Sequence, residues 1–141
     1  MVVLRRSWWR HDAEEPRMHE MVLVDTSVWV SHLREGNDRL AALSDEGMVC
    51  CHPFVIGELA CGNLKNRLEI LSLLQALPIT EVADHEEILA FIDNNRLMGK
   101  GLGYVDIHLL GSAVLSGVSL WTADRPLAQA ASALGVCYSP I

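Results

Sequence analysis

Four carboxylates interrupt apolar stretches at four separate places in the chain. They are Asp25, directly after Val22–Val24; Glu58, within Val55–Leu59; Asp106, within Gly103–Leu109; and Asp124, shortly after Leu120. Burying an ionised carboxylate costs several kcal/mol unless it is paired or bound to a metal, and few basic residues accompany these four. Their pattern indicates a shared cation, and oxygen-only ligands favour Mg²⁺ or Mn²⁺ over zinc.

Hydroxyl side chains stand close to two of these carboxylates in sequence. Thr26 and Ser27 follow Asp25, and Thr122 precedes Asp124 by two residues. Metal ligands need neighbours that hold them in orientation, and we expect these three hydroxyls to do so. Because clustered carboxylates repel one another, their pKa values should rise without metal and fall again when metal binds.

Strand and helix patterns alternate along the chain. Strands are predicted at 22–24, 48–51, 79–82, 119–122 and 136–138, and helices at 27–33, 38–44, 53–62, 64–74, 84–97, 104–116 and 126–134. Asp84, with Glu87 three residues later, predicts a capping box for the helix that ends near 97. This order predicts an α/β fold with a mainly parallel sheet covered by helices on both faces.

The predicted elements place the four carboxylates at one end of the sheet. Asp25 and Asp124 follow strands, whereas Glu58 and Asp106 lie in the first turns of helices. In open parallel sheets, ligands bind beyond the carboxyl ends of the strands. We therefore expect the four side chains to converge there.

Length and composition fit one domain of ordinary size. The chain has 141 residues, half of them hydrophobic, and a mean hydropathy of +0.22. Every stretch near the ~18 residues of a membrane span carries polar breaks, and residues 1–10 lack the apolar run of a signal peptide. We therefore expect a cytoplasmic chain with no membrane segment, whose four cysteines are reduced thiols.

The net charge of −7 bears on the choice of partner. Residues 1–20 are neutral overall, so the rest of the chain carries this charge. Because nucleic-acid-binding proteins are usually basic, a nucleic acid would need a local patch, a bound metal or a basic partner.

Four stretches together carry a family resemblance: Val24–Trp29, His52–Ala60 with Gly62–Leu64, Gly101–Leu110, and Leu120–Leu127. Their order, spacing and context show that residues 21–141 resemble a PIN domain, most closely the VapC-type ribonuclease toxins of toxin–antitoxin pairs. Two positions depart from the family pattern: Ala123, where a basic residue is frequent, and Tyr104, where tryptophan is frequent.

The resemblance implies a three-layer α/β/α fold with a mainly parallel central sheet. It also implies a metal-dependent endoribonuclease that cleaves RNA, is inhibited by a cognate antitoxin and forms a homodimer. The carboxylates that match the family's metal site and catalytic residues are Asp25, Glu58, Asp106 and Asp124. Mg²⁺, or Mn²⁺ in its place, suits this chemistry because a bound cation activates water and offsets charge on the phosphate.

Each carboxylate also has an ordinary structural interpretation. Asp25, Asp106 and Asp124 could cap helices, and Glu58 could be one half of a buried ion pair. A second function also stays open: a catalytically weak PIN-like binding module whose acidic sheet end receives a basic protein. The complete acidic set favours the nuclease.

Several further features carry weaker predictions. His108 lies about 200° round a helix from Asp106, so we expect a structural histidine or a dimer contact there. The groove of a homodimer could be lined by Arg34, Arg39, Lys65 and Arg96. Residues 1–20 precede the family pattern and are predicted to be a leader outside the fold. The alternative for Trp8 and Trp9, beside basic residues, is an RNA-stacking arm.

Overall fold

A parallel sheet forms the centre of the fold. The structure, a computed structural model, describes residues 18–140, so most of the predicted leader lies outside the described residues. After a short 3₁₀ turn, η1 (Met18–Glu20), the central strand β1 (Val22–Val24) pairs in parallel with β2 (Val49–Cys50) and β3 (Ser119–Trp121). The order is β2-β1-β3. β1 is apolar throughout and fully buried, as expected of a central parallel strand.

The outer edges of the sheet differ from the sequence prediction. The strands expected at 79–82 and 136–138 are reduced to single parallel bridges, Cys51 with Ile79 and Leu120 with Cys137. At the first edge, Cys51 N–H donates to Pro78 O and Thr80 N–H donates to Cys51 O. The chain then leaves the sheet, and Val82 is 48% exposed. Both predictions were therefore right in position and wrong in length.

Seven α-helices occupy the described part of the chain: α2 (Thr26–Glu35), α3 (Asp38–Asp45), α4 (Pro53–Cys61), α5 (Arg67–Gln75), α6 (His85–Asn95), α7 (Tyr104–Ser116) and α8 (Arg125–Ala133). The predicted capping box of Asp84 and Glu87 opens α6. α5 begins later and α6 ends earlier than predicted, because Asn66 (φ 54°) and Arg96 (φ 52°) adopt the left-handed conformation and interrupt helical geometry.

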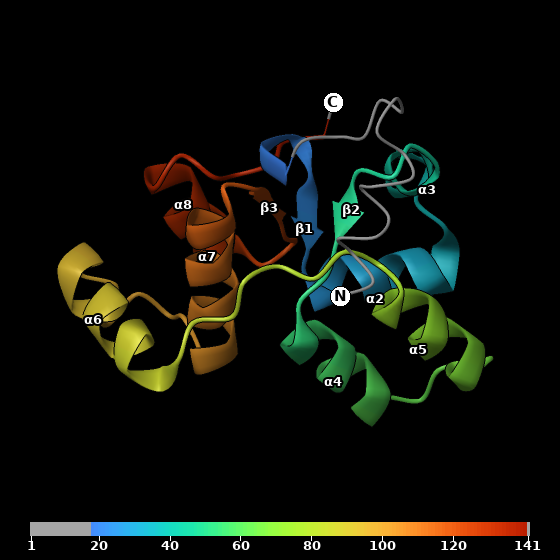
Figure 1. The fold of residues 1–141 in the computed structure, drawn as a ribbon, viewed down its shortest axis with the longest axis horizontal. Coiled ribbons are helices and arrows are strands. Elements are labelled where there is room, and N and C mark those ends of the chain that lie inside the picture. The colour runs from blue at the N-terminus through green and yellow to red at the C-terminus, as the bar shows by residue number, and fades with distance from the viewer. Residues whose placement is uncertain (1–17, 141) are drawn as a thin grey trace, which may run out of the picture.

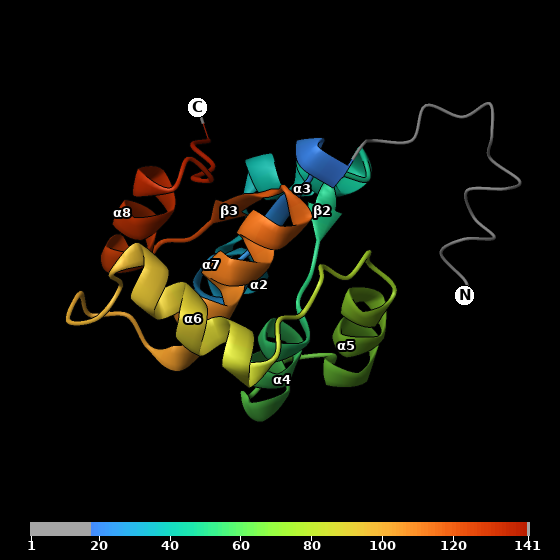
Figure 2. The same ribbon diagram turned by 60° about the vertical axis from the view of Figure 1, so that its left-hand side comes forward.

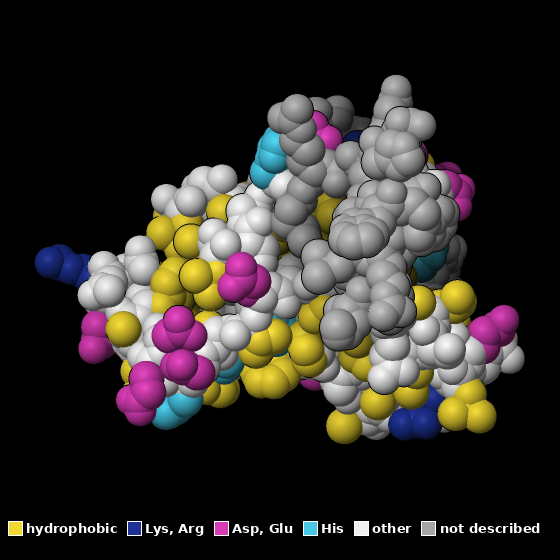
Figure 3. All heavy atoms as spheres, in the orientation of Figure 1, with side chains coloured by type: hydrophobic (Ala, Val, Ile, Leu, Met, Phe, Trp, Pro, Cys, Tyr) yellow, Lys and Arg dark blue, Asp and Glu magenta, His cyan; other side chains and the backbone are white. Residues whose placement is uncertain are grey.

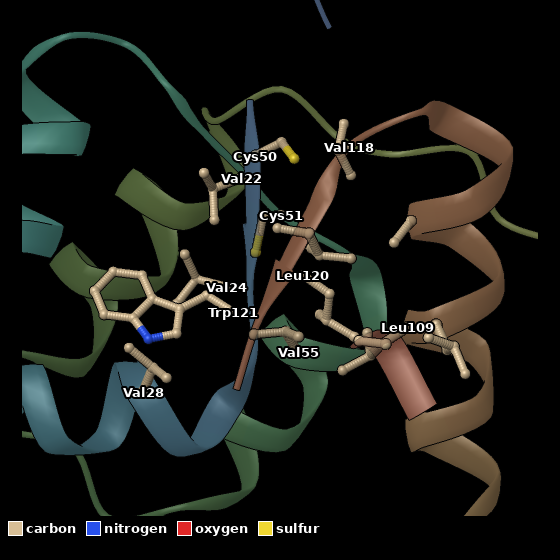
Figure 4. Packing of buried hydrophobic residues seen from close by; sticks show 14 of the residues in the cluster. Val22, Val24, Val28, Cys50, Cys51, Val55, Leu109, Val118, Leu120 and Trp121 are labelled. Atoms are coloured by element: carbon tan, nitrogen blue, oxygen red, sulfur yellow. The ribbon is translucent and has the colours of Figure 1, made fainter. Parts of the chain in front are cut away.

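The helices cover both faces of the sheet. α7 packs beside β3 with α6 outside it, while α2, α4 and α5 lie across the sheet from them (Figures 1 and 2). In the core, Val24 and Trp121 face Val28 of α2, whereas Leu120 faces Leu109 of α7 (Figure 4). This alternation is the period of two that strands impose. It confirms the predicted three-layer α/β/α arrangement.

Two expectations about composition can be compared with the structure. No helix in residues 18–140 is both long and apolar enough to cross a membrane. All four cysteines are free thiols, and Cys50 and Cys51 are buried. Burial raises the pKa of Cys50 to about 12 and that of Cys51 to about 11, so both stay neutral and behave as small apolar core residues.

Candidate active site

Asp25 stands at the carboxyl end of β1 and is the N-cap of α2. It is only 6% exposed, and its backbone N–H donates to Trp121 O at the end of β3. Its Oδ1 accepts a hydrogen bond from Thr26 N–H at 2.7 Å. Its Oδ2 accepts from Ser27 Oγ at 2.9 Å and from Thr122 Oγ1 at 2.6 Å. A buried carboxylate is thus held by neutral donors, which fix its orientation without cancelling its charge.

Glu58 reaches the same region from α4. Pro53 opens this helix at its first turn and His52 caps it, which suits proline because its missing N–H needs no partner there. Val55 and Leu59 anchor α4 in the core and leave Glu58 exposed. Thr26 Oγ1 donates to Glu58 Oε1 at 2.6 Å and so joins α4 to the start of α2. Among the described residues Glu58 forms no ion pair. The alternative interpretation of Glu58 as one half of a buried ion pair is therefore wrong for this part of the chain.

Asp124 and Asp106 complete the set from the other half of the chain. Asp124 caps α8, where its Oδ2 accepts from Leu127 N–H at 3.0 Å. Asp106 lies in the first turn of α7, and its Oδ2 accepts from Gly103 N–H at 3.0 Å. Asp25 and Asp124 are therefore N-caps, as the structural interpretation held, whereas Asp106 lies three residues after the N-cap Gly103 and reaches back to its N–H. Capping engages only one oxygen of Asp106 and of Asp124, so it leaves the other free to bind a ligand.

The negative charges of the other three carboxylates act on Asp106. Its pKa lies above the ordinary value, mainly because the side chain is half-buried and also because of the negative charges of Asp124, Asp25 and Glu58. The hydrogen bond from Gly103 opposes this rise. Charge effects of this kind act over short distances in a protein. The sequence expectation that the four side chains converge at one end of the sheet is consistent with this coupling.

The carboxylates do not form a ready-made cage. Across residues 18–140, no group of three or more His, Cys, Asp or Glu side chains is already arranged to hold a metal ion. The coupling at Asp106 nevertheless places all four within electrostatic reach. The two observations agree physically, because like charges keep apart until a cation neutralises them.

The three predicted orienting hydroxyls all contact the acidic set. Thr26 bonds Glu58, while Ser27 and Thr122 bond Asp25. Thr122 Oγ1 also accepts from Asp124 N–H at 3.0 Å, and Ser27 Oγ accepts from Ala123 N–H at 3.0 Å. The hydroxyls therefore connect the ends of β1 and β3 and hold the loop before Asp124.

His108, two residues after Asp106 on α7, packs against aromatic rings. His108 is 3% exposed, and its ring centroid lies 4.6 Å from that of Phe54 and 4.6 Å from that of Tyr104. Burial and the nearby His85 lower its pKa. The sequence reasoning placed His108 away from Asp106 as a structural or dimer-contact residue, and its burial within one protomer fits the structural role.

The sequence analysis assigned no role to His52, which lies at the start of α4. It is fully buried, its Nδ1 accepts from Phe54 N–H at 2.9 Å, and its Nε2 has no partner among the described residues. Burial, with His108 as a lesser cause, lowers its pKa to about 4. The available signal was a polar residue directly before the proline that opens a helix.

The chain matches known proteins over most of its length. The family model described as the PIN domain matches residues 22–133. The chain belongs to the PIN-domain family. This PIN domain is 47% identical over 120 residues to Ribonuclease VapC32 of Mycobacterium tuberculosis, in strain H37Rv and in strain CDC 1551. The alignments cover 84% of this chain and 97% of the relative.

A solved structure supports the fold of this PIN domain. The crystal structure of PAE2754 from Pyrobaculum aerophilum matches with a TM-score of 0.55, covering 83% of each chain at 19% identity. At that identity the likeness concerns the fold alone. The family match and the VapC relatives together confirm the predicted resemblance to VapC-type PIN ribonucleases.

Proposed function

We propose that this PIN domain is a metal-dependent endoribonuclease toxin, and that its four converging carboxylates hold Mg²⁺, or Mn²⁺ in its place. The residues are Asp25, Glu58, Asp106 and Asp124. The observation that carries the proposal is the hydrogen-bonded arrangement at the strand ends, where Thr26, Ser27 and Thr122 link Asp25, Glu58 and Asp124. The raised pKa of Asp106, caused mainly by burial and further by the charges of the other three carboxylates, agrees with it.

The residues have distinct roles in this proposal. Asp25 is the best-ordered ligand, because its carboxylate is buried and accepts three hydrogen bonds. Glu58 and Asp106 supply charge from α4 and α7, and Asp124 acts from the start of α8. When bound, the cation would activate water and offset the negative charge of the scissile phosphate. The donor set fits Mg²⁺ and Mn²⁺ because it consists of oxygen atoms alone.

Charge also explains the proposed partners. RNA and an acidic site repel each other, and the bound cation removes part of that repulsion. The same acidic end suits a basic segment of a cognate antitoxin, whose insertion would displace both metal and RNA. We place both partners, and the toxin, in the cytoplasm. The relatives named Ribonuclease VapC32 support the ribonuclease part of this proposal.

We also propose that the chain forms a homodimer. Large apolar side chains are exposed, including Leu68 (81%), Leu73 (60%) and Leu115 (51%). Figure 3 shows hydrophobic side chains spread over one face of the molecule and acidic ones gathered over α6. Apolar surface of this kind commonly lies in a symmetric interface. Sedimentation of the purified chain should show a dimer at micromolar concentration, and a monomer at tens of micromolar would contradict it.

The alternative is a catalytically weak module that binds a basic protein. Incubating the purified chain with cellular RNA and Mg²⁺ separates the two. The nuclease requires cuts at defined internal positions that disappear with chelator and return with added Mg²⁺. Tight binding of an antitoxin without any such cuts would favour the binding module.

A further inference from the structure

A cavity of about 550 Å³ opens beside the acidic site. It lies between one face of α2, the end of α4, the linker 62–66 and the start of α5. Thr26 and Glu58 line it, and the hydrogen bond between them forms the boundary with the carboxylate cluster. Anything that fills the cavity therefore touches a side chain of the candidate active site.

The walls of the cavity combine three kinds of chemistry. Val30, Leu59 and Ile70 supply apolar surface. Asn63 and Asn66, from the linker, supply amides that both donate and accept hydrogen bonds. This combination of flat apolar contact and amide groups suits a nucleobase, which has an apolar face and a polar edge.

The cavity also carries positive charge in an acidic protein. Arg34 and Lys65 line it, whereas Glu58 is its single acidic residue. Within residues 18–140, neither basic side chain forms an ion pair with an acidic residue. Because the whole chain carries −7, these two cations mark a local surface that attracts phosphate.

Of the four basic residues expected to line an RNA groove, Arg34 and Lys65 line the cavity. Arg39 instead donates to Tyr138 Oη, and Arg96 ends α6.

The linker wall has a defined conformation. Arg67 donates from Nε and Nη2 to the carbonyl of Ala60, at 3.2 and 3.0 Å, and so ties the start of α5 to the end of α4. Asn66 takes the left-handed conformation at φ 54° and ψ 44°, which asparagine tolerates better than most residues. A preformed pocket avoids the entropic cost of ordering on binding.

We propose that this cavity holds the nucleotide next to the cleaved phosphate of a single-stranded RNA, and that it sets base preference at that position. The inference rests on the proposed nuclease function. Asn63 and Asn66 contact the edge of the base, the apolar wall packs on its face, and Arg34 and Lys65 bind adjoining phosphates. The volume is within the ~300–1,000 Å³ range of pockets that bind small ligands. The shared Glu58 places this nucleotide directly beside the cut.

The charge contribution can be measured through salt. Each phosphate contact on single-stranded nucleic acid contributes about 0.7 to the slope of log affinity against log salt. The double variant R34Q/K65Q should bind a short RNA at least tenfold more weakly, with the slope reduced by about 1.4. Binding is followed by fluorescence anisotropy in Ca²⁺ in place of Mg²⁺. R96Q removes one positive charge outside the cavity, at the C-cap of α6, and a slope that falls as much as in the double variant would contradict the assignment.

The base contribution can be measured through cleavage. Substrates that differ only at the nucleotides flanking one cut site should show a preference with the wild-type chain. N66G keeps the left-handed backbone, because glycine adopts it freely, while it removes the amide. N66G, and more strongly N63A/N66G, should flatten the preference at one flanking position while kcat on the best substrate falls by less than threefold. A purely structural effect would lower all rates equally and keep the preference.

The outcomes separate this inference from the function on which it rests. A wild-type chain that cleaves RNA, with R34Q/K65Q keeping its salt slope and N63A/N66G keeping its base preference, would overturn the subsite alone. If these variants lose antitoxin binding and keep RNA binding, the cavity binds the antitoxin. That result would also overturn the proposed nucleotide subsite. A wild-type chain that binds RNA with the predicted slopes but never cleaves would contradict the nuclease while it supports RNA binding by the cavity.

Discussion

Thr122 Oγ1 donates a 2.6 Å hydrogen bond to Asp25 Oδ2, so one hydroxyl from the end of β3 holds the buried carboxylate at the end of β1. The same oxygen accepts from Asp124 N–H at 3.0 Å. Thr122 therefore contacts the carboxylate of Asp25 and the backbone of Asp124 at once. Because β1 and β3 are adjacent parallel strands, this link joins the two halves of the acidic site through the centre of the sheet.

Replacing this hydroxyl should damage catalysis more than folding. Thr122→Val keeps the shape of the side chain but removes the donor to Asp25, and we expect kcat/KM to fall about tenfold, or about 1.4 kcal/mol. The Mg²⁺ concentration for half-maximal cleavage should rise as well. Thr122→Ser, which retains the hydroxyl, is the matched control. A valine variant with the metal requirement and rate of the wild type would contradict the positioning role.

The raised pKa of Asp106 predicts a linkage between pH and metal. Its proton is lost at a higher pH than that of an ordinary aspartate, so protons compete with the cation more effectively as pH falls. The Mg²⁺ concentration for half-maximal activity should therefore increase as the pH is lowered below neutrality. Saturating Mg²⁺ should move the acid limb of the pH–rate profile to lower pH. An acid limb that does not move with metal concentration would exclude this coupling.

His52 predicts a loss of stability in mild acid. Its pKa is lowered from 6.5 to about 4 in the fold, so the buried ring stays neutral where the unfolded chain is protonated. The free energy of unfolding is therefore unaffected by this group above pH 6.5, and it decreases as the pH falls from 6.5 towards 4. The whole shift corresponds to about 3 kcal/mol. Denaturant unfolding at a series of pH values measures this.

The control for that experiment is His52→Asn. Asparagine is a good N-cap, so its side-chain oxygen can still accept from Phe54 N–H, but it does not titrate. The variant should be less stable at neutral pH and lose less stability on acidification than the wild type. Equal pH dependence in both proteins would show that other groups cause the loss.

Deleting residues 1–20 should leave the domain intact. Met21 is buried and accepts a hydrogen bond from Ser119 N–H, whereas His19 and Glu20 are exposed and contact each other. We expect cleavage rate, metal dependence and the unfolding midpoint to be unchanged. A tenfold loss of cleavage, about 1.4 kcal/mol in the transition state, would instead favour the RNA-stacking arm considered for Trp8 and Trp9.

The central elements could be predicted because their sequence patterns are local. Val22–Val24 is an unbroken apolar run, and Asp84 with Glu87 is a capping box that the structure contains. The edges could not be predicted equally well. Ile79 and Cys137 each make one bridge, and their pairing depends on backbone contacts with Cys51 and Leu120 that no local pattern records. The left-handed Asn66, which delays α5, is similarly set by the linker that Arg67 ties down.

In the candidate site, too, the features set by local sequence could be predicted and the long-range contacts could not. The types and positions of the four carboxylates, and the three hydroxyls near them, were readable because each interrupts an apolar stretch. Their partners were not, since Thr26 contacts Glu58 across 32 positions and Thr122 contacts Asp25 across 97. The burial of His52 against Phe54 and His108 does not follow from spacing, because it depends on how α4 and α7 lie in the fold. The cavity bounded by Thr26 and Glu58 likewise arises only where α2 and α4 pack together.

The most direct test of the central claim is metal-dependent cleavage of RNA by charge-neutral variants of the acidic residues. Asp25→Asn, Glu58→Gln and Asp106→Asn keep side-chain shape but remove the charge that would hold Mg²⁺. Each should abolish cleavage and toxicity while folding normally, and Asp124→Asn should be milder because a fourth ligand can act through a bound water. Cleavage retained by any two of the first three variants in Mg²⁺ would contradict the assignment.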